Sequence, residues 1–161
     1  MKIVIIGGGW SGCAAAISAR KAGAEVEIIE KTDLLLGLGN VGGIMRNNGR
    51  YTAAEELIAL GAGDLINITD ANTLHKNIDF PGHEHAWLYN VNRIEPAVRR
   101  HIEKMGIKMR FVSRVVDVDM EGIKIKGIYL SNGEYIEADV FVETTGSTGP
   151  MGNCLRYGNG C

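Results

Sequence analysis

Three glycines near the N-terminus have the spacing of a phosphate-binding turn. Gly7, Gly9 and Gly12 form a Gly-x-Gly-x-x-Gly motif directly after a short apolar run, and an alanine-rich segment follows them. In such a turn the first glycine allows a sharp bend, the second lets the backbone approach a pyrophosphate, and the third lets a helix pack closely on a strand. Trp10 and Ser11 lie where the free amides at the start of a helix would face the phosphates.

An acidic residue follows at the distance expected for contact with a nucleotide ribose. Glu30 ends a second β-branched run 18 residues after Gly12, and a carboxylate there can hydrogen-bond the two ribose hydroxyls. Lys31 comes next, and no arginine is placed to meet a 2′-phosphate, which favours FAD or NAD over NADP. The alternative is a glycine turn without a ligand; the flanking strand, the helix and the terminal acid argue against it.

The elements that must position these groups alternate between strands and helices. Residues 2–6 are almost wholly apolar and predict a strand buried on both faces. Residues 10–23 predict a helix that ends at Gly23, and residues 25–29 predict a second strand. Strand, glycine turn, helix and strand within thirty residues make a βαβ unit with a right-handed crossover.

Two more helices are expected in the middle of the chain. They cover about residues 52–61 and 92–105, and each has a glutamate, Glu55 or Glu95, at the third position of a capping box. Residues 63–91, between the two helices, are the least readable part of the chain.

From residue 109 onward the pattern changes to strands. Three of them are expected to form an antiparallel meander, over residues 109–119, 123–130 and 134–138, with Asn132-Gly133 as a tight hairpin. Residues 138–142 predict a further buried strand. The fold class is therefore α/β: one Rossmann-like domain over residues 1–161, with a mainly parallel sheet, helices on its faces and the meander on one side.

The composition excludes several classes of protein. The chain has 161 residues, a formal net charge of −2 and 45% hydrophobic residues, and its 22 glycines have no collagen period, so fibrous and disordered classes are excluded. No apolar run approaches the ~20 residues of a membrane span, and no signal peptide is recognisable. A pI of 6.1 gives no global electrostatic case for nucleic acid. Three cysteines, an odd number, favour a reducing compartment, so we expect a cytoplasmic protein.

In its motifs the sequence resembles the FAD-dependent oxidoreductases with a glutathione-reductase-type flavin domain, and it is most similar to the GidA-related bacterial flavoproteins. The first shared feature is the phosphate turn together with Glu30, and the second is the glycine pair at 42–43. The third is the segment 138–146, which ends in Thr-Thr-Gly where the family usually has Ala-Thr-Gly, so that Thr144 replaces an alanine. The predicted meander also matches the family.

The resemblance implies bound FAD and redox chemistry at the flavin. Gly42 and Gly43 would belong to a loop over the pyrophosphate and the flavin. Val115 would hold the adenine through its backbone, and Thr145 and Gly146 would close the site from the opposite strand end. No side chain presents itself as a general acid, base or nucleophile.

Two arginines, Arg46 and Arg50, follow the glycine pair. If this loop reaches the flavin, an arginine here could meet the pyrophosphate or the N1–C2=O edge of the ring, where it would stabilise the reduced anion. A purely structural loop is the alternative.

The cysteines suggest redox or metal chemistry only weakly. Cys154 and Cys161 lie in a Gly/Cys-rich tail, residues 147–161, and could bind an iron–sulfur cluster or form a redox pair beside the flavin. Their spacing is not a standard cluster spacing, so we interpret them as incidental thiols. Cys13, on the alanine-rich helix, is expected to be a small buried residue.

Two polar clusters are interpreted as solvated surface. His75 and the residues 83–85 (His-Glu-His) suggest a metal site, but no second cluster reinforces them and Pro81-Gly82 predicts a turn, so a solvated loop is favoured. The basic residues of 92–110 suggest RNA contact, which the GidA resemblance would allow. Glutamates dilute that patch and no aromatic residues are interleaved, so neither a metal nor a nucleic acid is predicted.

The resemblance also bears on partners. Family members complete the flavin site with a later segment and carry a substrate domain, and neither is present in the 161 residues. We therefore expect the N-terminal part of a flavin domain, a truncated product, or a subunit whose flavin site is completed by a second subunit or a homo-oligomer. The reaction partner would be a small-molecule redox substrate or an electron carrier. An NAD-binding dehydrogenase fragment and a non-catalytic dinucleotide-binding subunit are the alternatives.

Overall fold

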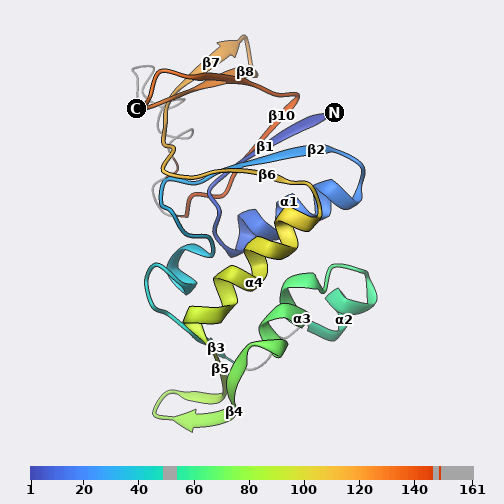
Figure 1. The fold of residues 1–161 in the computed structure, drawn as a ribbon, viewed down its shortest axis with the longest axis vertical. Coiled ribbons are helices and arrows are strands. Elements are labelled where there is room, and N and C mark those ends of the chain that lie inside the picture. Colours follow the sequence, from blue (N-terminus) through green and yellow to red (C-terminus); the bar gives the residue numbers. More distant parts are fainter. Residues whose placement is uncertain (49–53, 147–148, 150–161) are drawn as a thin grey trace.

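The computed structural model describes residues 1–48, 54–146 and 149, and a four-stranded parallel sheet lies at its centre (Figure 1). Its strands lie in the order β10 (Val140–Glu143), β1 (Lys2–Ile6), β2 (Glu25–Ile29) and β6 (Lys108–Arg110). Ile5 of β1 is in register with Ile28 of β2 and with Val142 of β10. The predicted α/β class and the predicted strands β1, β2 and β10 are confirmed, with β10 beginning two residues later than expected.

The sheet separates two apolar cores because β1 is apolar on both faces. Ile3 and Ile5 face the helices α1 (Trp10–Lys21) and α4 (Val91–Lys104), whereas Val4 and Ile6 face the meander. Figure 1 shows these layers, with α1 and α4 on one side of the sheet and β7 and β8 on the other. This arrangement is why the first strand reads as a continuous apolar run and not as an alternating one.

The meander consists of β7 (Val115–Glu121), β8 (Lys124–Leu130) and β9 (Tyr135–Glu137), all antiparallel. The predicted hairpin at Asn132-Gly133 joins β8 to β9. There the Gly133 amide donates to the Leu130 carbonyl at 2.9 Å, and the φ of Gly133 is +85°. The three-stranded meander is therefore confirmed.

The predicted strand over residues 109–119 was wrong in one respect, because the chain changes sheets within it. β6 pairs with β2 in the parallel sheet, and only β7 belongs to the meander. Between them the backbone bends at Val112, whose φ is +50°. The amides of Val112 and Ser113 donate to the carbonyls of Thr32 and Glu30 at 3.0 and 2.9 Å, and these bonds fix the bend.

Residues 63–91, the least readable part of the sequence, contain a helix and a hairpin. They form α3 (Asp64–Ala71), β4 (Thr73–Phe80) and β5 (His83–Tyr89). β5 lies between β4 and β3 (Arg46–Asn48) in an antiparallel sheet. The loop expected around the histidines was therefore wrong, because these residues belong to two paired strands that turn at Pro81-Gly82, where the φ of Gly82 is +83°.

The remaining helices follow the predictions with small shifts. α2 (Ala54–Ala59) lies in the expected segment, and the predicted capping residue Thr52 falls outside the described residues. α4 begins two residues earlier than a capping box at Asn92 would require, because Asn90 is its N-cap and accepts from the Asn92 amide at 3.0 Å. Within the described ranges, no helix combines the length and the apolar character needed to cross a membrane.

Candidate dinucleotide-binding site

The phosphate turn lies where the order of the parallel strands changes direction. β1 continues through α1 to β2 on one side, while β10, the last strand of the sheet, lies on its other side. Gly7 follows the carboxyl end of β1 and Thr144 follows that of β10, and the Thr144 amide donates to the Ile6 carbonyl at 2.8 Å. Open α/β sheets bind ligands in the crevice outside the carboxyl ends of their strands at such a switch point.

The three glycines of the turn have three different environments. The φ of Gly7 is +103°, and a Cβ added there would lie 2.6 Å from the Thr144 carbonyl oxygen. A Cβ on Gly12 would lie 1.9 Å from the Gly7 carbonyl oxygen, whereas a Cβ on Gly9 would have no described atom within 4 Å. The packing of the chain therefore requires glycine at positions 7 and 12, while Gly9 faces open space from which a ligand can approach its backbone.

The N-terminus of α1 provides free amide groups beside Gly9. Gly9 is the N-cap, and its carbonyl accepts the first intrahelical bond, from the Cys13 amide at 2.9 Å. In the described part of the chain, the amides of Ser11 and Gly12 have no hydrogen-bond acceptor, and the first turn of α1 contains no acidic side chain. The positive end of the helix dipole is thus available to an anion.

The side chain of Trp10 is half-buried and packs against the apolar core on the helix side of the sheet. Its ring contacts the Tyr89 ring edge-on, with the ring centroids 5.7 Å apart. The Tyr89 hydroxyl lies 2.7 and 2.8 Å from the carbonyl oxygens of Gly39 and Ile44, to which it can donate. Burial raises the pKa of Tyr89, and the indole N–H of Trp10 partly offsets that rise. Trp10 therefore joins the turn to the loop after Gly39, and only its backbone belongs to the turn.

Glu30 is fixed at the end of β2 beside the turn. Its side chain is buried, one carboxylate oxygen accepts from the Gly8 amide at 2.7 Å, and the other accepts from the Thr32 amide at 2.8 Å and the Thr32 hydroxyl at 2.9 Å. A carboxylate has about four acceptor positions, so it can still receive a hydroxyl group from a ligand. The negative charge of the Glu30 carboxylate disfavours a phosphate group of a ligand at this position. Lys31 is exposed next to it.

Val115 lies near Glu30 without presenting its side chain to the surface. The Ser113 amide donates to the Glu30 carbonyl at 2.9 Å, so the chain entering β7 runs along the end of β2. The Val115 side chain is buried between the parallel sheet and the meander, which leaves its backbone as the part that could meet an adenine. That contact stays a prediction.

The end of β10 forms the other side of the site. The Thr144 hydroxyl lies 2.8 Å from the carbonyl oxygens of both Ile6 and Gly7, and it ties β10 to the turn. Thr145 is half-buried, and its amide donates to the Glu143 carboxylate at 3.1 Å. Gly146 is exposed with a φ of +82°.

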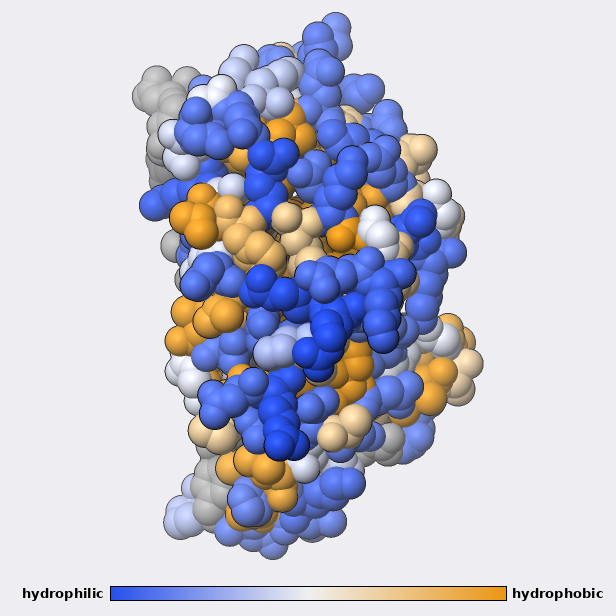
Figure 2. All heavy atoms as spheres, in the orientation of Figure 1, coloured by the Kyte–Doolittle hydropathy of each residue, from blue (hydrophilic) through white to orange (hydrophobic). Residues whose placement is uncertain are grey.

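The glycine loop starts against the turn and continues away from it. A Cβ on Gly37, in the short 3-10 helix η1 (Gly37–Gly39), would lie 3.5 Å from the Gly9 Cα, whereas Gly42 and Gly43 are exposed farther along. The loop exposes four large apolar side chains: Leu38, Val41, Ile44 and Met45. Figure 2 shows apolar surface on the side of the molecule where this loop runs.

Several predicted residues lie outside the described residues. They are Arg50 and the cysteines 154 and 161, with all of the tail except Gly149. Among the residues that the structure describes, no group of histidine, cysteine and acidic side chains is arranged to hold a metal ion. Cys13 is fully buried, as predicted, with its thiol 3.4 Å from the Gly8 carbonyl, and burial raises its pKa to about 12.

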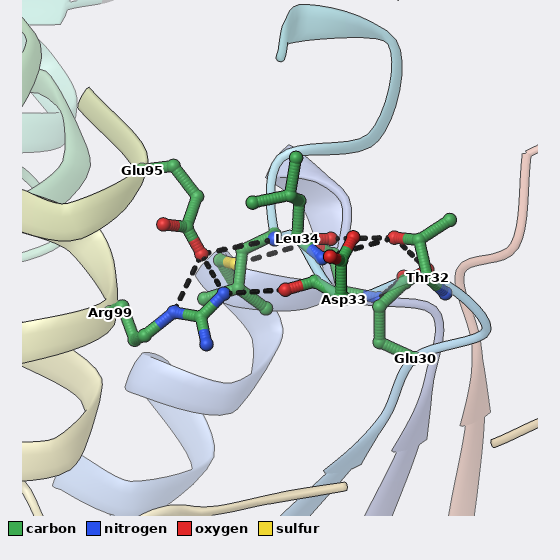
Figure 3. Close-up of polar contacts among 9 residues, drawn as sticks. Glu30, Thr32, Asp33, Leu34, Glu95 and Arg99 are labelled. Carbon is green, nitrogen blue, oxygen red and sulfur yellow. Dashed lines mark hydrogen bonds and ion pairs between the residues drawn. The ribbon is translucent and has the colours of Figure 1, made fainter. Parts of the chain in front are cut away.

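An ion pair that the sequence pattern did not predict lies next to the site. Glu95 was predicted to cap α4, but it is buried and accepts from the Leu35 amide at 3.3 Å and from the Arg99 guanidinium (Figure 3). Arg99 also donates to the Asp33 carbonyl at 2.7 Å. The four-residue spacing of Glu95 and Arg99 was the available signal, since residues at i and i+4 share a helix face.

One family model matches nearly the whole sequence. The match covers residues 2–160, and the model is described as "Glucose inhibited division protein A". A comparison with curated proteins finds no match.

Solved structures share the fold at low sequence identity. THI4 from Thermovibrio ammonificans has a TM-score of 0.68 and 17% identity, over 96% of this chain and 61% of that protein. FqzB has a TM-score of 0.69 and 20% sequence identity, and the match covers 99% of this chain and 39% of FqzB. CtdE, determined in complex with FAD and a substrate, has a TM-score of 0.63 and 21% sequence identity. The match covers 91% of this chain and 38% of CtdE. This chain thus spans less than two thirds of each of these proteins.

Proposed function

Because the chain belongs to the glucose-inhibited division protein A family, we propose that it forms the FAD-binding part of a flavin-dependent oxidoreductase. The observation that carries the proposal is the geometry of the phosphate turn. Gly9 faces open space at the switch point of the sheet, and the amides of Ser11 and Gly12 lie beside it. The buried carboxylate of Glu30 lies at the edge of the same turn.

The residues present fit a dinucleotide with an unmodified ribose. The pyrophosphate would lie against Gly9 and the start of α1, and the adenosine ribose would donate to Glu30. The adenine would lie along the backbone at Val115. The apolar loop with Gly42 and Gly43 would extend toward the flavin. CtdE, which has a similar fold, binds FAD, and this supports FAD over NAD.

A bound flavin supplies hydride or single-electron transfer. The contribution of this chain would be to hold and orient the cofactor. The N-terminal end of α1 would neutralise the pyrophosphate charge, and the Glu30 carboxylate would select a ribose with free hydroxyl groups. Thr145 and Gly146 would limit the site on the β10 side. A small-molecule redox substrate or an electron carrier would be the reaction partner.

We further propose that a second subunit or a second copy of the chain completes the flavin site. β10 lies at the edge of the parallel sheet, and Val140 on this strand is 40% exposed. The loop of residues 38–45 exposes four large apolar side chains on the same chain. Sheet edges and exposed apolar loops are typical of surfaces that another chain covers. Light scattering of the purified protein would show a single 17.4 kDa species if this proposal is wrong.

The cofactor proposal is tested by titrating the purified chain with FAD and following the quenching of flavin fluorescence. We expect saturable binding, flavin absorption bands in the bound protein, and loss of those bands with dithionite. NADH in the same assay is the control, and it should compete weakly or not at all. A protein that ignores FAD and binds NADH would contradict the proposal.

A further inference from the structure

The segment after Glu30 lies between the phosphate turn and α4. We call residues 32–37 the strap. On one side it contacts the turn, because the Leu36 amide donates to the Gly8 carbonyl at 2.7 Å and Leu36 forms a parallel bridge with Gly9. The strap therefore determines where the backbone of the turn lies on the side opposite β10.

On its other side the strap is held by two side chains of α4. The Leu35 amide donates to the Glu95 carboxylate at 3.3 Å, and the Arg99 guanidinium donates to the Asp33 carbonyl at 2.7 Å. Arg99 also donates from Nε to the Glu95 carboxylate at 2.7 Å. Figure 3 shows this pair facing the strap, with Glu30 and Thr32 at the far end of the same network.

The two side chains of this pair differ in burial, because the Arg99 side chain is 29% exposed. Glu95 is 4% exposed, and a buried carboxylate is stable only with hydrogen-bond partners. The Arg99 guanidinium also lies over the Phe111 ring, 4.2 Å from its centroid, and this contact fixes its orientation. An ion pair with one partner open to solvent contributes little to stability by itself, so the bonds from this pair to the strap are its more specific contribution.

The backbone of the strap needs such outside contacts. Leu36 has a φ of +73°, in the left-handed region that residues with a side chain adopt at a cost, and it is buried. A strained conformation persists only where its surroundings fix it. Glu95 fixes the residue directly before Leu36, and the Gly8 carbonyl fixes Leu36 itself.

We propose that Glu95 and Arg99 are positioning residues for the cofactor site. They hold the strap from α4, and through the strap they keep the phosphate turn in the shape that accepts a pyrophosphate. This inference rests on the proposed function, because the shape of the turn affects affinity only if the turn binds a dinucleotide. Neither side chain touches the turn directly in the described contacts.

Three variants test the role of Glu95. Glu95→Leu removes the acceptor of the Leu35 amide, and we expect the Kd for FAD to rise at least about tenfold. Glu95→Gln keeps an oxygen for that amide and should restore most of the affinity. The matched control is Glu27→Leu, since Glu27 is also buried and paired with Arg110 at 3.1 Å, but lies in β2 and is bonded to no strap residue in the described part of the chain. The control should leave the Kd within about twofold of the wild type.

A second measurement does not depend on the cofactor. Hydrogen exchange of the cofactor-free chain should show faster exchange in residues 32–37 for Glu95→Leu and unchanged exchange there for Glu27→Leu. The inference is wrong if exchange in the strap is unchanged in Glu95→Leu, or if Glu27→Leu raises the Kd as much. A wild-type chain that binds no FAD would refute the proposed function, and the exchange data would then still decide whether Glu95 holds the strap.

Discussion

The phosphate turn allows stability and binding to be separated with two single-methyl substitutions. In Gly12→Ala the new Cβ would lie 1.9 Å from the Gly7 carbonyl oxygen, a backbone atom that cannot move without shifting β1 or α1. Overpacking of this kind costs about 1–3 kcal/mol or more of unfolding free energy. In Gly9→Ala the Cβ meets no described atom within 4 Å, and the backbone, with φ −68° and ψ −177°, suits any residue. We therefore expect this variant to lose at most about 1 kcal/mol.

The affinity for FAD should depend on these two positions in the opposite way, with the larger loss in Gly9→Ala. The Cβ of Gly9→Ala would occupy the space through which a pyrophosphate reaches the amides at the start of α1. Hydrogen bonds to charged groups contribute about 1.5–3 kcal/mol, so losing one should raise the Kd for FAD about 10- to 100-fold.

The assay combines thermal unfolding of the cofactor-free variants, followed by circular dichroism, with FAD titration followed by fluorescence. Gly43→Ala, in an exposed part of the loop, is a useful comparison because its effect should come from its positive φ of +66° alone. The reasoning would be refuted by a Gly9→Ala protein that binds FAD as tightly as the wild type. It would also be refuted by a Gly12→Ala protein that unfolds at the wild-type temperature.

Three further predictions concern single side chains. Thr144→Val removes the hydroxyl that ties β10 to the turn, so urea unfolding should show a loss of about 1 kcal/mol, whereas Thr144→Ser should lose less. Because burial raises the pKa of the Cys13 thiol to about 12, iodoacetamide at neutral pH should label the peptide that contains Cys13 only after denaturation; labelling of the native protein would contradict this. Burial opposes the ionisation of Asp64, but Lys21 outweighs it and lowers the pKa of Asp64. The stabilisation is therefore present above the unfolded pKa and is lost as pH falls through the lower folded pKa, so acid unfolding should be less steep in Asp64→Asn than in the wild type.

The first thirty residues were predictable because several local signals coincide there. The apolar run of β1, the glycine turn and the β-branched run of β2 each specify one element, and together they specify a βαβ unit. Asn132-Gly133 likewise specified the hairpin, since its backbone geometry needs few other residues.

The strand predicted over residues 109–119 is divided between two sheets, and this division depends on hydrogen bonds to residues far away in the sequence. A run of valines looks the same whether it belongs to one strand or to two. The bend at Val112 is fixed by bonds from Val112 and Ser113 to carbonyls at the end of β2, about eighty residues earlier in the chain. No local pattern contains that information.

The hairpin of β4 and β5 was hidden for another reason. Its register shifts between His75 and Ile78 and again beyond Ile78, and Asn77 and His85 have φ values of +52° and +55°. These irregularities disturb the two-residue alternation by which strands are recognised. Glu95 shows a related ambiguity, since a capping glutamate and a buried one can have the same neighbours in sequence. Only the packing of α4 on the strap distinguishes them.

The way Glu30 is held has a consequence for the selectivity of recognition. Three bonds from Gly8 and Thr32 fix its rotamer from within the chain, so the carboxylate does not have to be ordered by an incoming molecule. Ordering a mobile side chain on association costs about 0.5–1.5 kcal/mol, and a site that is already ordered avoids that cost. For the same reason, the Glu30 carboxylate cannot rotate away from a ligand group that fits badly. A ligand that places a phosphate beside Glu30 would therefore meet a negative charge that cannot move aside, and the repulsion would remain in the bound state.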